Sequence, residues 1–157
     1  MSYLSQLLHL QPNSISSQES LISVAKHSLS ERSKNLLELA AFRIALDTAM
    51  QPMIVSDKDG NFIMWNQEAR LFSHLENMDT PPEEWSQHFE VFGLDGSPIP
   101  IDELPLLVAL REEERREGVY FVNSPGRGRE KMRIRAHPVM VDGTLWGGIL
   151  WWSVLNE

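Results

Sequence analysis

The feature that most constrains the fold of this chain is a long β-hairpin predicted at its C-terminal end. Two segments with the character of β-strands, 129–141 and 145–155, flank the dipeptide Asp142-Gly143. Asp-Gly in this position predicts a tight turn, because such turns need positive backbone φ and glycine adopts it without steric cost. The chain is therefore expected to end in two antiparallel strands that the remaining elements must cover.

The strand predicted at 129–141 alternates between basic and apolar residues. Successive side chains of a strand point to opposite faces, so the basic positions share one face and the apolar positions share the other. The basic row is Arg127, Arg129, Lys131, Arg133 and Arg135, and the inward positions are Met132, Ile134 and Ala136. We interpret the basic row as a solvated face paired with neighbouring acids such as Glu112, Glu113 and Glu114, with docking of an acidic partner or nucleic acid as the alternative.

The strands predicted at 145–155 and 62–66 are apolar on both faces. In the first, Leu150 and Trp152 alternate with Ile149 and Trp151, and in the second, Phe62 and Met64 alternate with Ile63 and Trp65. A strand that is apolar on both faces belongs to a sheet that is covered on both sides. The sequence leaves open which face of 145–155 is inward.

A second Asp-Gly dipeptide, Asp59-Gly60, separates strands predicted at 53–56 and 62–66. Segment 57–68 also matches the carboxylate spacing of an EF-hand calcium loop, but that loop needs glycine at its sixth position, where Phe62 stands. A turn explains the segment better: Asp57 accepts hydrogen bonds from the turn, and Asn66 caps a helix predicted at 67–75. No metal site is predicted.

The N-terminal part of the chain is predicted to be helical. Segment 28–50 contains no proline or glycine, and its apolar residues form two stripes, which are Leu39, Phe42, Leu46 and Ala49 and, more weakly, Leu37, Ala41, Ile44 and Thr48. Two stripes predict two partners, one in the same chain and one in a second copy. Capping-box spacings at Ser16/Glu19 and Ser28/Glu31 predict helix starts.

The order of predicted elements indicates an α+β fold. One or two helical turns are predicted at 83–92, a helix from an N-cap at Asp102 to about Glu114, and a further strand at 119–123. The expected architecture is a five-stranded antiparallel sheet with short helices on one face. Residues 1–48 are predicted to be a helical extension for dimerisation or capping, and residues 49–157 the domain itself.

Composition restricts the function further. The 157 residues include no cysteine, which excludes disulfides, thiolate metal sites and cofactors bonded through sulfur. The net charge is −8, and all of it arises from residues 51–157, so nucleic acid is an improbable partner. No apolar run approaches 18 residues and no signal peptide is evident, so no membrane span and a cytoplasmic location are expected. No catalytic motif has its required context, so the chain is predicted not to be an enzyme.

Three blocks of the sequence resemble PAS domains. "MIVSDKDGNFIMWNQEA" resembles the opening strands and first short helix, "FGLDGSPIPIDELPLLVAL" the approach to the long helix, and "MRIRAHPVMVDGTLWGGILWWSV" the final hairpin. The resemblance covers about residues 45–155. It implies a sensory and signalling module with a pocket between the sheet and the short helices. It also implies homodimerisation through an N-terminal helix packed on the outer face of the sheet.

The resemblance supplies the candidate site residues. Those expected to line a ligand pocket are Ile54, Ser56, Phe62, Met64, Leu107, Met132, Ile134 and Ala136. Those expected at a dimer interface are Leu39, Phe42, Leu46, Ile63, Trp65 and Trp151. The alternative is that the first set simply fills a core.

The cofactor of such a module is left unknown. A cysteinyl-flavin adduct is excluded because there is no cysteine. Non-covalent flavin is compatible with the sequence, and haem would need an axial ligand such as His74, His88 or His137.

The resemblance implies a partner or an attached output domain such as a histidine kinase. The sequence stops just after the last strand, so the chain is expected to be either a fragment or a stand-alone module acting through a partner. Two functions therefore remain. One is a small-molecule sensor, and the other is a ligand-free docking or dimerisation module that regulates a partner such as a transcription factor.

Overall fold

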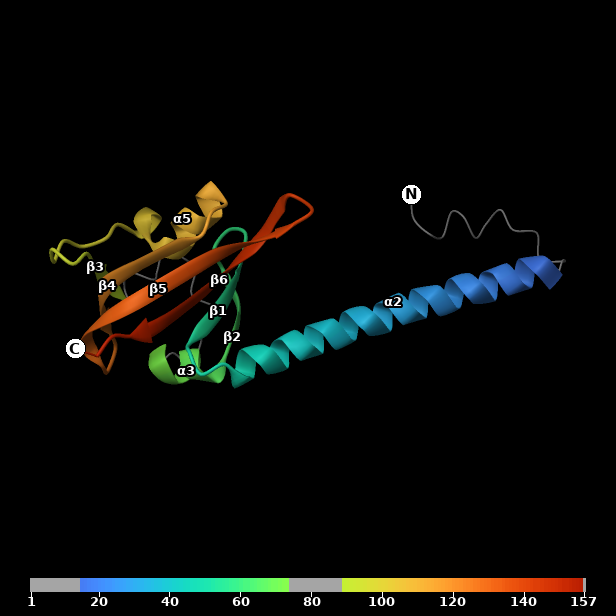
Figure 1. The fold of residues 1–157 in the computed structure, drawn as a ribbon, viewed down its shortest axis with the longest axis horizontal. Coiled ribbons are helices and arrows are strands. Elements are labelled where there is room, and N and C mark those ends of the chain that lie inside the picture. The colour runs from blue at the N-terminus through green and yellow to red at the C-terminus, as the bar shows by residue number, and fades with distance from the viewer. Residues whose placement is uncertain (1–14, 74–88, 157) are drawn as a thin grey trace. The chain divides into compact units, whose positions relative to one another are not determined.

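The computed structural model describes residues 15–73 and 89–156 of the chain (Figure 1). The chain divides into two compact units, Met1–Ile44 and Ala45–Glu157. No helix in the described ranges combines the length and the apolar character that crossing a membrane requires.

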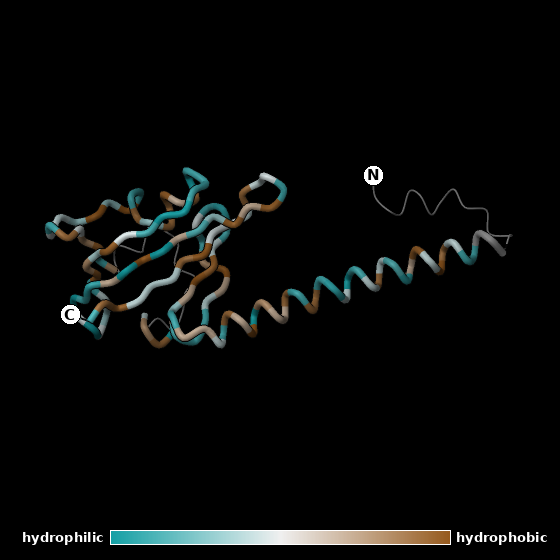
Figure 2. Tube along the Cα trace, viewed as in Figure 1, coloured by the Kyte–Doolittle hydropathy of each residue, from teal (hydrophilic) through white to brown (hydrophobic). Residues whose placement is uncertain are grey.

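Helix α2 (Ile15–Thr48) is continuous over 34 residues. Ser16 and Ser28 both lie inside it, so the capping boxes predicted there are wrong, because a capping residue needs non-helical backbone. Polar and apolar residues are mixed along the helix (Figure 2). In the single chain, exposed apolar side chains recur along it as far as residue 44, namely Ile22, Val24, Leu29, Leu36, Leu37, Leu39, Phe42 and Ile44.

The second unit is built on one antiparallel sheet with the order β2-β1-β6-β5-β4-β3. Its strands are β1 (Met53–Asp57), β2 (Phe62–Trp65), β3 (Glu90–Phe92), β4 (Arg116–Ser124), β5 (Gly128–Val141) and β6 (Thr144–Val154). The predicted α+β class and the terminal hairpin are confirmed. Asp142 and Gly143 turn the chain between β5 and β6 with φ of 50° and 74°.

The sheet has six strands in place of the predicted five. The additional strand, β3, pairs with β4 through Val91 and Val122. The helical turns predicted for 83–92 are therefore wrong at Glu90–Phe92, and the remainder of that segment lies outside the described residues. Three residues are too few for periodicity to separate a strand from a helical turn, so only the pairing with β4 fixes β3.

The helix predicted to begin at Asp102 is split in two. Asp102 lies in a 3₁₀ turn, η2 (Ile101–Glu103), and α5 (Pro105–Glu112) begins after Leu104, whose backbone is extended. The capping role predicted for Asp102 is wrong, because the residue before a proline avoids the helical region and interrupts the chain at Leu104. Helix α5 ends two residues before Glu114, and Glu113 follows it in a left-handed conformation.

Two helices pack on the same face of the sheet, which we call the inner face. Ala69 and Phe72 of α3 (Gln67–Ser73) join the core formed by Ile54, Met132, Ile134 and Trp152. Leu106, Ala109 and Leu110 of α5 pack on Ala136. The predicted inward parity of β5 is therefore confirmed, since Met132, Ile134 and Ala136 are all buried on this face.

The Gly147-Gly148 pair lets both neighbours approach β6 closely. A Cβ on Gly147 would lie 2.1 Å from the backbone oxygen of Ser56 in β1. A Cβ on Gly148 would lie 2.8 Å from Leu106 Cδ1 and 3.0 Å from Leu110 Cδ2 of α5. The two glycines therefore serve strand pairing and helix packing respectively.

The turn between β1 and β2 is organised by Asp57, as predicted. Its Oδ1 accepts hydrogen bonds from the backbone N–H groups of Asp59 and Asn61, each at 2.9 Å. Its Oδ2 accepts a third bond from Asn61 Nδ2 at 3.0 Å. Partial burial raises the pKa of Asp57, but the bonds from the Asn61 side chain, Asn61 N–H and Asp59 N–H outweigh it and lower the pKa below its ordinary value.

The predicted cap at Asn66 is also confirmed, and the residue does more than cap. Its Oδ1 accepts a hydrogen bond from the N–H of Ala69 at 2.9 Å and another from the N–H of Met53 at 3.0 Å. Its Nδ2 donates to the carbonyl oxygen of Gln51 at 2.8 Å. The fully buried Asn66 therefore ties the start of α3 to the start of β1.

Candidate functional site

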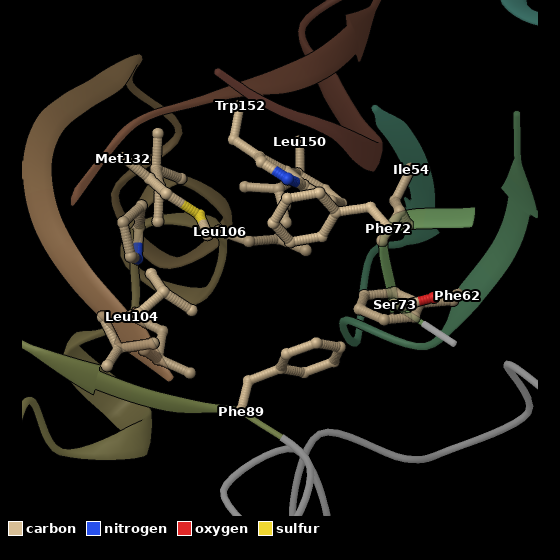
Figure 3. A pocket seen from close by; sticks show the side chains of 14 residues that line it. Ile54, Phe62, Phe72, Ser73, Phe89, Leu104, Leu106, Met132, Leu150 and Trp152 are labelled. Atoms are coloured by element: carbon tan, nitrogen blue, oxygen red, sulfur yellow. The ribbon is translucent and has the colours of Figure 1, made fainter. Parts of the chain in front are cut away.

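A cavity of about 100 Å³ lies between the inner face of the sheet and the helices that cover it (Figure 3). It is lined by Ile54, Phe62, Phe72, Ser73, Phe89, Val91, Leu104, Pro105, Leu106, Val122, Met132, Ile134, Leu150 and Trp152. These residues come from all six strands, from the end of α3 and from the start of α5, with Phe89 just before β3. Folding therefore brings together residues that are almost 100 positions apart in the sequence, from Ile54 to Trp152.

Four of the eight predicted pocket residues line this cavity, namely Ile54, Phe62, Met132 and Ile134. Three others lie elsewhere on the inner side. Ser56 and Ala136 are buried, with Ala136 packed under α5, and Leu107 packs against the same cluster. Leu106, the neighbour of Leu107, occupies the lining position on the helix.

The eighth residue, Met64, faces the other way, because a β-bulge changes the parity of β2. Val55 pairs with Met64 and Ser56 pairs with Phe62, so Ile63 is an extra residue without a partner in β1. Beyond the bulge, Trp65 pairs with Ile54 and packs against the inner core. Met64 was predicted to line the pocket and Trp65 to face outward, and both predictions are wrong, because the bulge turns Met64 outward and Trp65 inward.

The inward parity of β6, which the sequence left open, is set by its partners. Trp152 pairs with Ile134, and Leu150 pairs with both Ala136 and Ile54, so these two side chains are inward. Sequence reasoning also missed Phe72 and Ser73. Their signal was present, because they follow the capping residue Asn66 at the spacing of one helical face, together with Ala69.

The cavity is almost entirely apolar. Among the lining residues within 15–73 and 89–156, none carries a charge, and the only polar side-chain atoms belong to Ser73 and Trp152. Ser73 Oγ donates a hydrogen bond to the carbonyl oxygen of Ala69 at 2.7 Å. Trp152 Nε1 is buried and has no hydrogen-bond partner within residues 15–73 and 89–156.

One wall of the cavity is formed by aromatic rings, and an arginine outside the lining packs on one of them. The ring of Phe72 meets the ring of Trp152 edge-on, with centroids 5.3 Å apart (Figure 3). The guanidinium of Arg127, on the turn between β4 and β5, lies 4.3 Å from the centroid of the same Phe72 ring. Two hydrogen bonds of 2.8 and 2.9 Å to the carboxylate of Glu130 hold Arg127 in place. The position of the β4–β5 turn is thereby linked to the cavity wall.

Among the residues that the structure describes, the cavity offers neither the size of a haem or flavin site nor an axial ligand for haem. Its volume of about 100 Å³ is well below the roughly 300–1,000 Å³ of pockets that bury larger ligands. His137, one of the three histidines considered as a haem ligand, lies on the outer face, where its ring is 4.9 Å from that of Trp151. His74 and His88 lie outside the described residues.

The outer face of the sheet has an apolar half and a charged half. The apolar half is formed by β1 and β6, where Met53 pairs with Trp151 and Val55 pairs with Ile149. In the charged half, Glu117 Oε1 lies 3.6 Å from Arg133 Nε and Glu117 Oε2 lies 3.2 Å from Arg135 Nε. Within the predicted basic row, Arg133 and Arg135 are therefore paired with Glu117, and Arg127 with Glu130, rather than with Glu112–Glu114.

The predicted dimer residues are distributed between these surfaces. Trp151 lies in the apolar half of the outer face, and Ile63, in the bulge, is 56% exposed. Leu39 and Phe42 are exposed on α2, whereas Leu46 is 3% exposed and already covered within one chain. Trp65 packs inward, as described above.

Comparison with known proteins identifies the fold. No protein-family model and no characterised protein matches the sequence, but solved structures do. The PAS domain of Bordetella pertussis BvgS matches with a TM-score of 0.53 and 18% identity over 76% of this chain and 87% of its own.

Two further solved PAS domains are similar to this chain. The PAS domain of an HTR-like protein from Haloarcula marismortui matches with a TM-score of 0.55 and 12% identity, over 80% of this chain and 99% of its own. A PAS domain from a two-component sensor histidine kinase matches with a TM-score of 0.55 and 8% identity, over 77% and 99%. The chain therefore has the fold of a PAS domain, as its three sequence blocks predicted.

Proposed function

We propose that this chain is a sensory module that works as a homodimer and passes its signal to a partner protein or to an output domain such as a histidine kinase. The observation that carries the proposal is the apolar half of the outer face. Trp151 and Ile149 are adjacent there, next to the buried Val55, on the side of the sheet opposite α3 and α5, and both are only half-buried in the single chain. A sheet that is apolar on both faces needs a cover on each.

Helix α2 supplies a second apolar surface for a homodimer. Ile22, Leu29 and Leu36 are exposed at intervals of seven residues, which is the repeat of a coiled coil. Ala25 lies three residues after Ile22, and Leu39 lies three residues after Leu36, which is the spacing from an a position to a d position. A long helix without a packed face gains little stability from its own sequence. Pairing of α2 with the α2 of a second copy would bury this row.

The likeness to sensor proteins supports the signalling role. One of the similar structures is the PAS domain of a two-component sensor histidine kinase. Fold alone does not fix a function, so the output remains part of the proposal. No feature of the described residues favours catalysis, and we propose a non-enzymatic role in the cytoplasm.

The mass of the full chain in solution tests the homodimer. We expect a dimer at about 20 µM by light scattering, and we expect Leu29→Lys combined with Leu36→Lys to shift it toward monomer. The matched control is Lys34→Leu, which changes an exposed helix position outside the seven-residue row. A monomeric wild-type chain at that concentration would refute the proposed dimer.

The alternative function is a ligand-free docking module. The volume of the cavity among the described residues favours it, because about 100 Å³ is well below that of pockets that bury larger ligands. Native mass spectrometry of the purified chain separates the two functions. A bound small molecule at stoichiometric occupancy would exclude the docking module in its ligand-free form.

A further inference from the structure

We propose that mild acid dissociates the homodimer, because His137 lies in the surface that the dimer buries and must be uncharged there. This regulation rests on the proposed homodimer and names a condition that controls it. Three observations lead to it, namely the place of His137 on the outer face of the sheet, its contact with Trp151, and the positive charges around it.

His137 continues the apolar half of the outer face onto β5. It pairs with Ile149 of β6, which pairs in turn with Val55 of β1, so the three residues form one row across the sheet. The ring of His137 lies 4.9 Å from the ring of Trp151, and both side chains are half-buried in the single chain. A second copy that covers Trp151 and Ile149 would therefore cover His137 as well.

The charged groups on the β4 side and on β5 itself disfavour a charged imidazole. Arg115 comes directly before β4, and Arg135 is two residues from His137 on the same face of β5. The one carboxylate beside them belongs to Glu117, and its Oε2 lies 3.2 Å from Arg135 Nε, so it is engaged with that arginine. An imidazolium at position 137 would add a third positive charge to this group.

The described residues of β6 and β1 offer no counter-ion on the other side. Beside His137 the outer face of β6 carries Ile149 and Trp151, and Asp57 of β1 directs its carboxylate into its own turn. Partial burial and, next, the positive charge of Arg115 lower the pKa of His137 below its ordinary value. The residue is therefore mostly neutral at neutral pH, the form that an apolar interface requires.

Burial in a dimer would disfavour the charged imidazole further. An ion that moves from water into an apolar interface loses its hydration, so the pKa of a buried histidine falls. A dimer that keeps His137 neutral binds fewer protons than two separate chains, and protons therefore favour dissociation. Dimerisation is strongest above the pKa that His137 has in the single chain and weakens as pH falls through it. A twofold-symmetric dimer contains the residue twice, which doubles the effect in free energy.

The dissociation constant of the full chain, measured by sedimentation equilibrium at pH 7.5 and pH 5.5, tests this regulation. Between these values carboxylates of ordinary pKa remain ionised, whereas histidine titrates. We expect the constant of the wild type to rise about tenfold or more at pH 5.5. We expect His137→Phe to respond by less than about twofold. The matched control is His27→Gln, which changes an exposed histidine of α2 outside the seven-residue row and should behave as the wild type.

The titration of His137 itself provides a second measurement. Its imidazole C–H resonance is followed with pH in the dimeric wild type and in the variant that combines Leu29→Lys with Leu36→Lys, which is expected to be monomeric. We expect a lower pKa in the dimer, because only the dimer covers the ring. Should His137→Phe not fold, as judged by circular dichroism, His137→Gln removes the titrating group with a polar side chain.

The regulation is overturned if the dissociation constant is the same at both pH values, if it falls in acid, or if the position-137 variants keep the response of the wild type. An equal pKa of His137 in dimer and monomer also overturns it, because the residue then lies outside the interface. In all these cases the dimer stands. A chain that is monomeric at pH 7.5 overturns the proposed dimer and its regulation together.

Discussion

The guanidinium of Arg127 lies 4.3 Å from the centre of the Phe72 ring, so the turn between β4 and β5 contacts a side chain that forms the cavity wall. The same ring contacts the ring of Trp152 edge-on, and Trp152 belongs to the buried core. The guanidinium of Arg127 is held by its bidentate pair with Glu130, while its backbone N–H donates to the carbonyl oxygen of Ser124. Weakening the Arg127–Glu130 pair is therefore expected to change the packing of Phe72 in the cavity wall as well as the conformation of the turn.

We expect Arg127→Met to lower the free energy of unfolding by about 1 kcal/mol, because methionine retains the apolar stem but loses the cation–π contact and the ion pair. The free energy is measured by urea denaturation. Lys131→Met serves as the control, since it removes a charge from the same strand pair without touching Phe72. An equal loss in both variants would show that the Arg127–Phe72 contact contributes nothing specific.

The two adjacent glycines of β6 are expected to differ in their tolerance of alanine. In Gly147→Ala the new Cβ meets a backbone oxygen at 2.1 Å, which cannot move without displacing β1. In Gly148→Ala it meets the ends of two flexible leucine side chains at 2.8 and 3.0 Å. We expect losses in the free energy of unfolding of about 3 kcal/mol or more and about 1 kcal/mol respectively. Thermal and urea unfolding of the pair measures the difference, and a reversed order would contradict this account of β6.

Asn66 should be among the most sensitive polar positions in the domain. Asn66→Ala removes the cap of α3 and leaves the N–H of Met53 and the carbonyl of Gln51 without their partners. We expect the free energy of unfolding to fall by about 2–4 kcal/mol. Asn61→Ala, in the exposed turn, is the control, with an expected loss of about 0.5 kcal/mol. Similar losses would indicate that the buried network around Asn66 is replaceable.

Asp57 is expected to contribute to the acid sensitivity of the domain. Its pKa is lowered in the folded state, so its hydrogen bonds stabilise the fold above its ordinary value of 3.8, and this stabilisation is lost as pH falls below that value through the folded pKa. Asp57→Asn removes the titrating group. We therefore expect the stability difference between wild type and Asp57→Asn to shrink when urea denaturation at pH 7 is compared with pH 3. A difference that is constant or larger at pH 3 would exclude this role.

Features governed by local chemistry were predictable from the sequence. The Asp142-Gly143 hairpin, the Asp57 turn and the Asn66 cap each depend on a few neighbouring residues, and each was found where it was predicted. The parity of β5 was equally clear, because its basic and apolar residues alternate and only one face can be buried. The three blocks that resemble a PAS domain likewise predicted the fold.

Only the tertiary structure decided which side chains meet inside. The bulge at Ile63 exchanges the faces of Met64 and Trp65, and no local signal marks it in a strand that is apolar on both sides. The parity of Leu150 and Trp152 depends on their partners Ala136 and Ile134 across the sheet. Strand β3 exists because β4 offers an open edge for pairing. A cavity lined by residues from eight elements is fixed by their long-range packing, whereas sequence patterns report on contacts between near neighbours.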